Sequence, residues 1–182
     1  MTDAADRLYE RVLVLRCRAR DGAAFEEIVA RYTPRLRYYL RKMLGEAAAV
    51  EDALQEVWLD AFRGITKLAE PGAFPAWVYR LARDRAFREL RRRRPHLPLE
   101  DVDVVDEAAD ADGFSAEDAG RIHGALDALP PEHREVLVLR FIEGMTYEEI
   151  AGVVGCQLGT VRSRLHYGKR ALRRVIEGTG IG

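Results

Sequence analysis

Three acidic side chains are the first candidates for chemistry in this sequence. Glu51, Asp52 and Glu56 lie in the segment AVEDALQEVW, where a helix would place two of the acids on one face. Such carboxylates can hold the divalent metal ion of a nucleic-acid enzyme. A metal centre usually needs further ligands close by, but the four histidines are scattered, at His96, His123, His133 and His166. We therefore expect no catalytic residue, metal site, cofactor or enzymatic activity, and interpret the acids as a solvated or docking face.

The arginine-rich segment that ends near residue 94 indicates a different chemistry. It contains eight arginines, Arg80, Arg83, Arg85, Arg88, Arg91, Arg92, Arg93 and Arg94. Trp77, Tyr79 and Phe87 are interleaved with them. A single strand of nucleic acid needs both phosphate neutralisation and a stacking surface, which this combination could supply. The alternative remains open that Trp77 and Phe87 belong to a hydrophobic core and that the arginines only keep the helix hydrated.

A second basic segment lies near the C-terminus, within a predicted helix-turn-helix. Thr146 and Glu149 predict a capping box at the start of one helix, and Gly155 permits the turn that ends it. The next helix is expected from about Leu158 to Ile176. Between residues 159 and 174 it carries six Lys or Arg and no acid. The residues left outward by its apolar pattern include Thr160, Arg162, Ser163, Arg164 and Tyr167, and Lys169 follows them. The pattern is typical of a recognition helix in a DNA major groove, although a solvated basic face remains an alternative.

The elements that would position these residues are all helical. Apolar residues recur at helical spacing over 23–41, 47–62 and 76–90, and again after residue 119. The segment GITKLAEPGAFP, between the second and third helices, contains two prolines and two glycines and is predicted to be a loop or a broken helix. We predict an all-α protein of two small helical domains, residues 1–94 and 119–182, with the helix-turn-helix in the second.

The charge of the chain is segregated, although its formal net charge is only −1. Residues 95–118 contain nine acids and no Lys or Arg, whereas residues 21–94 and 119–182 both have an excess of basic residues. The acidic strip is too poor in apolar residues to bury much surface, which predicts a flexible linker. A polyanion-binding surface on either flanking domain is therefore compatible with the net charge.

Cysteine use and hydropathy point to the cytoplasm. Cys17 and Cys156 are far apart and form no CxxC pair, a pattern typical of buried thiols in a reducing compartment. No apolar run approaches the ~20 residues of a membrane span, and the acidic N-terminus does not resemble a secretory signal. We expect a cytoplasmic protein without membrane insertion.

Four segments, in this order, resemble the extracytoplasmic-function sigma factors of bacterial RNA polymerase, from about Val12 to Ile176. They are RDGAAFEEIVARYTPRLRYYL, AAAVEDALQEVWLDAFRGI, GAFPAWVYRLARDRAFRELRR and ALDALPPEHREVLVLRFIEGMTYEEIAGVVGCQLGTVRSRLHYGKRAL. The resemblance implies a factor that binds core RNA polymerase and directs promoter-specific initiation. It would recognise the minus-thirty-five element as duplex and the minus-ten element as a melted strand. An anti-sigma factor is a further partner that the family implies, although no residue of the sequence specifies one.

The resemblance also implies roles for individual residues. Polymerase binding would fall to Asp52, Gln55 and Glu56, with Trp58 and Leu59 as apolar support or part of the contact. The loop from Ile65 to Pro75 would capture a flipped-out base of the minus-ten element. Contacts to that element would come from Lys67, Trp77, Arg80, Arg83, Asp84, Arg85 and Arg88. Contacts to the minus-thirty-five element would come from Thr160, Arg162, Ser163, Arg164, Tyr167 and Lys169. The acidic linker would thread toward the polymerase active centre, where its charge could mimic that of nucleic acid.

Two departures from the family pattern affect these expectations. Asp84 stands where the family often has Asn, and an aspartate repels phosphate but accepts a hydrogen bond from cytosine N4. Gln157 stands at the usual serine cap of the recognition helix and is a poorer N-cap. An alternative function is a free-standing regulator that binds duplex DNA and uses its N-terminal helices for dimerisation or ligand binding. Such a regulator would require neither the DALQEVW segment nor the arginine-rich helix.

Overall fold

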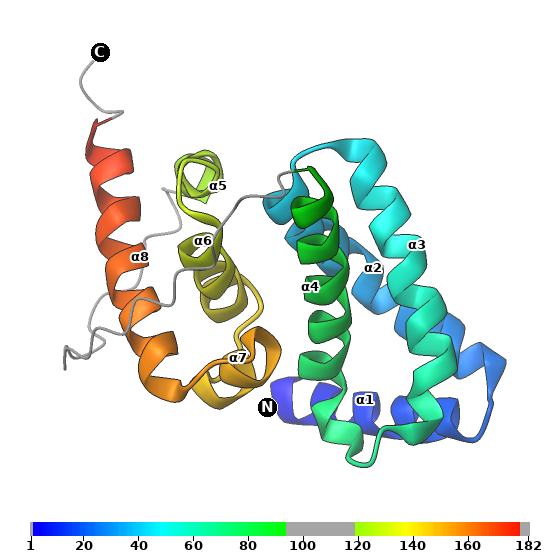
Figure 1. Cartoon of the computed structure of the whole chain (residues 1–182). Helices are drawn as coiled ribbons and strands as arrows, with labels where there is room; N and C mark the ends of the chain where they lie inside the picture. The colour runs from blue at the N-terminus through cyan, green and yellow to red at the C-terminus, as the bar shows by residue number, and fades with distance from the viewer. Residues whose placement is uncertain (1, 94–118, 179–182) are drawn as a thin grey trace. The chain divides into compact units, whose positions relative to one another are not determined.

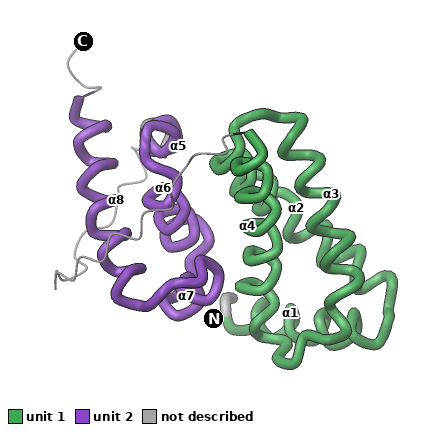
Figure 2. Tube along the Cα trace, viewed as in Figure 1, with its two compact units in different colours: residues 1–97 green, residues 98–182 purple. Residues whose placement is uncertain are grey.

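The computed structural model describes residues 2–93 and 119–178, and all regular secondary structure in these residues is helical. The chain divides into two compact units, residues 1–97 and 98–182, which Figure 2 shows in different colours. The all-α fold class is therefore confirmed. The acidic linker predicted at residues 95–118 lies outside the described residues.

Unit 1 is built from four long helices (Figure 1): α1 (Thr2–Arg18), α2 (Gly22–Leu44), α3 (Ala47–Gly64) and α4 (Phe74–Arg93). Two short 3₁₀ turns, η1 (Ile65–Lys67) and η2 (Pro71–Ala73), connect α3 to α4 where a loop or broken helix was predicted. Asp21 caps α2, since its side chain accepts a hydrogen bond from the Ala24 N–H. Gly45 follows α2 with φ of 75°, a conformation that favours glycine, and α3 then begins at Ala47.

The centre of unit 1 is a set of tyrosine and phenylalanine rings between α2 and α4. Tyr39 packs edge-on against Tyr79 with ring centroids 5.4 Å apart, and Tyr32 packs against Phe74 at 5.1 Å. All four side chains are buried. Because α2 contacts α1, α3 and α4, it is the central helix against which the surfaces of α3 and α4 are fixed.

Unit 2 contains α5 (Ala119–Leu126), α6 (Pro131–Leu137), the π-helical turn η4 (Val138–Ile142), α7 (Tyr147–Val154) and α8 (Leu158–Gly178). The capping box predicted from Thr146 and Glu149 is confirmed, with both of its hydrogen bonds present. Gly155 adopts the left-handed conformation expected for the residue after α7. The helix-turn-helix prediction is thus confirmed in α7 and α8.

The long helix α8 packs on α5, α6 and α7 and forms one wall of the core of unit 2. Val161, Leu165 and Leu172 are buried on its inner face. Gly168 lies on that face too, where an added Cβ would lie 3.3 Å from the Leu137 side chain. The glycine therefore permits close approach of α6 and α8.

Candidate nucleic-acid interface

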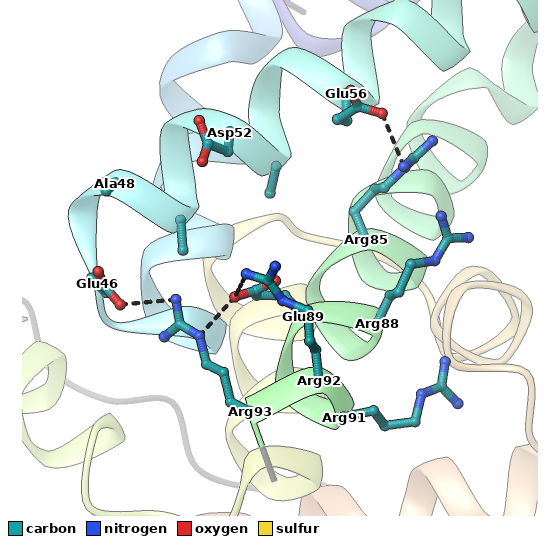
Figure 3. Close-up of a pocket in the computed structure, with 12 residues that line it drawn as sticks. Glu46, Ala48, Asp52, Glu56, Arg85, Arg88, Glu89, Arg91, Arg92 and Arg93 are labelled. Carbon is teal, nitrogen blue, oxygen red and sulfur yellow. Dashed lines mark hydrogen bonds and ion pairs between the residues drawn. The ribbon is translucent and has the colours of Figure 1, made fainter. Parts of the chain in front are cut away.

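A groove of about 780 Å³ runs between α3 and α4 in unit 1 (Figure 3). Its α3 wall carries acidic residues, and its α4 wall carries arginines. The charged lining residues are Glu46, Asp52, Glu56, Arg85, Arg88, Glu89, Arg91, Arg92 and Arg93. A surface with both signs of charge can bind a basic protein on one side and a polyanion on the other, so the pairing of each group decides what is available.

Most acids of α3 and the residue before it are engaged within unit 1. Glu51 Oε1 lies 2.7 Å from Arg37 Nε, and this arginine lowers the pKa of the carboxyl. Glu46 pairs with Arg93 at 2.8 Å. Asp52 is exposed and makes no ion pair within the described residues. It is consequently the acid of this wall that is most available to an external cation.

Arg85 was predicted to contact DNA, but its guanidinium is turned toward α3. Its Nη1 lies 3.0 Å from Glu56 Oε2, and its Nε donates to Asp60 Oδ2 at 3.0 Å, with a further contact from Nη2 to that same oxygen. The Arg85 side chain is only 21% exposed. In this structure Arg85 therefore links α3 to α4, and its predicted contact with the minus-ten element stays a prediction.

The arginines on the rest of α4 differ in their engagement. Arg92 and Arg93 both bind Glu89, and they lower the pKa of its carboxyl. Other arginines of α4 are exposed and form no ion pair within the described part of unit 1, namely Arg80, Arg88 and Arg91. These are the cations that a phosphate backbone can reach without displacing an existing partner.

The aromatic residues of α4 belong largely to the core. Tyr79 and Phe87 are buried, so Phe87, one of the two aromatic residues whose role was left open, belongs to the core. Arg83 lies over the Phe87 ring, 4.3 Å from its centroid. Trp77 is half-buried and lies against Gly64 so closely that a Cβ there would be 2.9 Å from the indole. The sequence gives no sign of this role of Gly64, because an isolated glycine at the end of a helix does not indicate which side chain packs against it.

The apolar residues at the C-terminal half of α3 fall into an inner and an outer group. Trp58 is half-buried and donates its indole N–H to Thr33 Oγ1 at 3.1 Å, which favours apolar support over direct contact with polymerase. Leu59 is 42% exposed and Gln55 is exposed, as a docking surface requires. Phe62, 51% exposed, extends this surface and was not predicted. Its helical spacing of three from Leu59 was the available signal.

In unit 2 the predicted recognition residues of α8 fall into a solvent-accessible group and a buried group. Arg162 is exposed, and the other predicted side chains are partly exposed, namely Arg164, Tyr167 and Lys169. Thr160 and Ser163 are buried, and the Ser163 hydroxyl donates to the Thr160 carbonyl at 3.0 Å. The expectation that these two point outward is wrong, since small polar residues can satisfy their hydroxyls on the helix backbone and pack inward.

The comparisons with known proteins agree with the division into two units. Residues 28–96 match the family described as Sigma-70 region 2, and residues 119–172 match Sigma-70, region 4. The chain is 36% identical over 167 residues to the RNA polymerase sigma factor CarQ of Myxococcus xanthus, an alignment that covers 87% of this chain and 94% of CarQ. It is 33% identical over 162 residues to the ECF RNA polymerase sigma factor SigE of Mycolicibacterium smegmatis, covering 82% of this chain and 60% of SigE. The chain belongs to the extracytoplasmic-function sigma factors.

A solved structure supports the fold of this sigma factor. The sigma factor RpoE of Bartonella quintana, in complex with the anti-sigma factor NepR, superposes with a TM-score of 0.64 at 21% identity, covering 84% of this chain and 96% of RpoE. As a member of the family, the chain is a transcription initiation factor and not an enzyme. It binds core RNA polymerase and recognises the minus-ten element through region 2 and the minus-thirty-five element through region 4.

The residues that the structure describes show neither a metal site nor a membrane-spanning helix. They contain no group of three or more His, Cys, Asp or Glu side chains placed to hold a metal ion. None of their helices is both long and apolar enough to span a membrane.

Proposed function

We propose that three exposed surfaces of this sigma factor perform its three binding tasks. The first is the outer face of α3, formed by Asp52, Gln55 and Leu59, with Glu56 at its edge. The observation that carries the assignment is the carboxylate of Asp52, which makes no ion pair within the described residues, on the same face of α3 as an exposed leucine two turns further on, while the neighbouring acids are already paired. A basic and apolar surface of core polymerase would gain both a charge partner and an apolar contact there.

The second surface holds the melted minus-ten strand and consists of the exposed side of α4 with the turns before it. Arg80 and Arg88 would neutralise phosphates, and Lys67 at the end of η1 is exposed nearby in sequence. Arg83 and Trp77, which are packed against Phe87 and Gly64, would shape this surface. Asp84, which is exposed, would favour a base with an amino group such as cytosine. Capture of one flipped base would offset the cost of unstacking.

The third surface is the outer face of α8. Arg162 and Arg164 in its first turns are suited to guanine in the major groove, and Tyr167 and Lys169 to the flanking backbone. The buried side chains of Thr160 and Ser163 would not touch the DNA. They would contribute only by fixing the position of α8 on the core of unit 2. Because the two units are joined in one chain, each would raise the effective concentration of the other at a promoter, so neither has to bind tightly alone.

Binding to polymerase and binding to DNA can be separated experimentally with substitutions at two charged residues, both of which are exposed and form no ion pair within the described residues. Asp52→Ala should weaken binding to core polymerase in the absence of DNA, measured by fluorescence anisotropy of the labelled sigma factor. Arg88→Ala should leave that binding unchanged and should weaken binding of the polymerase complex to a promoter with a premelted minus-ten strand. If both substitutions weakened the same step, the division between α3 and α4 would be incorrect.

We also propose that the protein acts in the cytoplasm and that an anti-sigma factor controls it. The support is the family membership together with the RpoE structure, in which that protein is bound to an anti-sigma factor. Co-purification of a specific inhibitory partner with the tagged protein tests this. The partner should abolish binding to core polymerase when added at equal concentration.

A further inference from the structure

The segment between α3 and α4, residues 65–73, has little core of its own. We call it the α3–α4 connection. Within it Ile65 is the one buried residue, and the rest consists of two short turns. Turns with so few buried contacts have low local stability, so their conformation depends on neighbouring elements. Helix α3 contacts η1 and α4 contacts η2, whereas α1 contacts both turns (Figure 1).

Two arginines of α1 reach consecutive residues of this connection. Arg11 Nη2 lies 3.1 Å from Glu70 Oε1, and the same carboxylate oxygen accepts the Gly72 N–H at 3.1 Å. Arg18 Nη1 donates to the Ala69 carbonyl at 3.4 Å. A guanidinium on α1 thus orients the carboxylate that caps η2. These contacts link residues that are 59 and 51 positions apart in the chain.

Helix α1 is packed firmly on the core of unit 1, which it must be if it is to hold the connection in place. Leu13 and Val14 are fully buried on its inner side. The Tyr32 hydroxyl of α2 donates to Glu10 Oε2 at 2.7 Å, and the Tyr32 ring packs against Phe74, the first residue after the connection. Helix α1 is therefore fixed to α2 on one side, while Arg11 and Arg18 extend to the connection on the other.

We propose that Arg11 and Arg18 are positioning residues for promoter recognition: they hold the α3–α4 connection in the conformation that discriminates between bases of the minus-ten element. The inference rests on the proposed role of this connection in minus-ten recognition. Arg11 and Glu70 are 55% and 62% exposed, so their ion pair contributes little to global stability. The ion pair therefore acts mainly on the conformation of the connection, which has only one buried residue of its own.

The test measures initiation by core polymerase with the full-length sigma factor on promoters that differ at single positions of the minus-ten element. Arg11→Ala should reduce the preference between the best and the next base by about threefold to fivefold at one position, the range that an exposed ion pair can supply. The unfolding midpoint of unit 1 should not change. Arg11→Lys, which keeps a cation near Glu70, should restore part of the preference. Arg18→Ala should act in the same direction, more weakly.

The matched control is Arg16→Ala. Arg16 lies on the same helix, is 49% exposed and pairs with Asp21 at 2.8 Å, but among the described residues it makes no hydrogen bond or ion pair with the connection. It should leave base preference unchanged. If Arg11→Ala lowered initiation equally on all promoters together with the unfolding midpoint, a merely structural role would replace the inference.

Substitutions in the connection itself separate the two hypotheses. Thr66→Ala and Leu68→Ala should alter minus-ten preference if the connection reads this element. If they do so and Arg11→Ala does not, the positioning role is overturned and the proposed function of the connection stands. If none of these variants alters the preference, the connection does not read the minus-ten element, and the positioning role falls with it.

Discussion

Arg85 offers the sharpest test of which arginines of α4 serve the fold and which serve DNA. Its guanidinium contacts Asp60 and Glu56 of α3, and the side chains of Arg85 and Asp60 are 21% and 29% exposed. Exposed ion pairs contribute about 0–1 kcal/mol, whereas loss of one partner from a buried pair costs about 3–5 kcal/mol. The Arg85–Asp60 pair is partly buried, so its exposure lies between these two cases. Arg85→Ala should therefore lower the free energy of unfolding of unit 1 by about 2 kcal/mol.

The intrinsic fluorescence of the full-length protein can report this change in unit 1. Both tryptophans of the chain, Trp58 and Trp77, lie in unit 1. With an m-value of about 2 kcal/mol per molar urea, the midpoint should fall by about 1 M. Arg85→Lys should recover only part of the lost stability, because a lysine ammonium cannot contact Glu56 and Asp60 with the several planar N–H groups of a guanidinium.

A double-mutant cycle with Asp60→Ala isolates the pair. The coupling energy should be about 1 kcal/mol or more, since each single substitution already removes the shared contact. Arg88→Ala is the control on the same helix, because Arg88 is exposed without an ion-pair partner in the described residues; it should change stability by less than about 0.5 kcal/mol. An unchanged midpoint in Arg85→Ala, together with a loss of promoter binding, would refute the assignment of Arg85 to the α3–α4 link.

Three further predictions follow from other local features. Thr146→Ala should destabilise unit 2 by about 1 kcal/mol, because it removes the hydroxyl that accepts the Glu149 N–H, and faster hydrogen exchange of that amide checks this. Gly64→Ala should cost about 1–3 kcal/mol by overpacking and shift the tryptophan emission, because the new Cβ would meet Trp77 at 2.9 Å. The Ala24 amide and then Arg16 lower the pKa of Asp21, so its capping contribution is present at neutral pH and is lost on acidification below about pH 4; Asp21→Ala should flatten the pH dependence of stability in that range.

The helices and the capping box could be predicted because they depend on local signals. Apolar spacing predicted α2, α3 and α4, and a threonine with a glutamate three residues later predicted the start of α7. The family resemblance then supplied the order of the functional segments, which spacing alone could not. The confirmed helices and the confirmed capping box are therefore features that one short segment of sequence is sufficient to specify.

The sequence could not indicate those side-chain contacts whose partner lies far away in the chain. Arg85 is 25 residues from Asp60, and nothing in the arginine-rich run distinguishes it from the exposed Arg88. The support of the α3–α4 connection by Arg11 was missed for the same reason, since Glu70 is 59 residues away. The error at Thr160 and Ser163 is local instead: both were expected to face outward because they are polar, yet a hydroxyl can bond to the backbone of its own helix and be buried.

The most direct test of the account is start-site selection in vitro on a library of promoter fragments, with core polymerase alone, with the wild-type protein, and with Arg88→Ala or Arg162→Ala. We predict new starts only when the wild-type protein and polymerase are both present, with two enriched sequence elements at a fixed spacing. Arg162→Ala should reduce the information in the upstream element, and Arg88→Ala should reduce opening at the downstream one. Strong binding to duplex DNA without any redirection of polymerase, or identical losses in the two variants, would contradict the proposed division of tasks between α4 and α8.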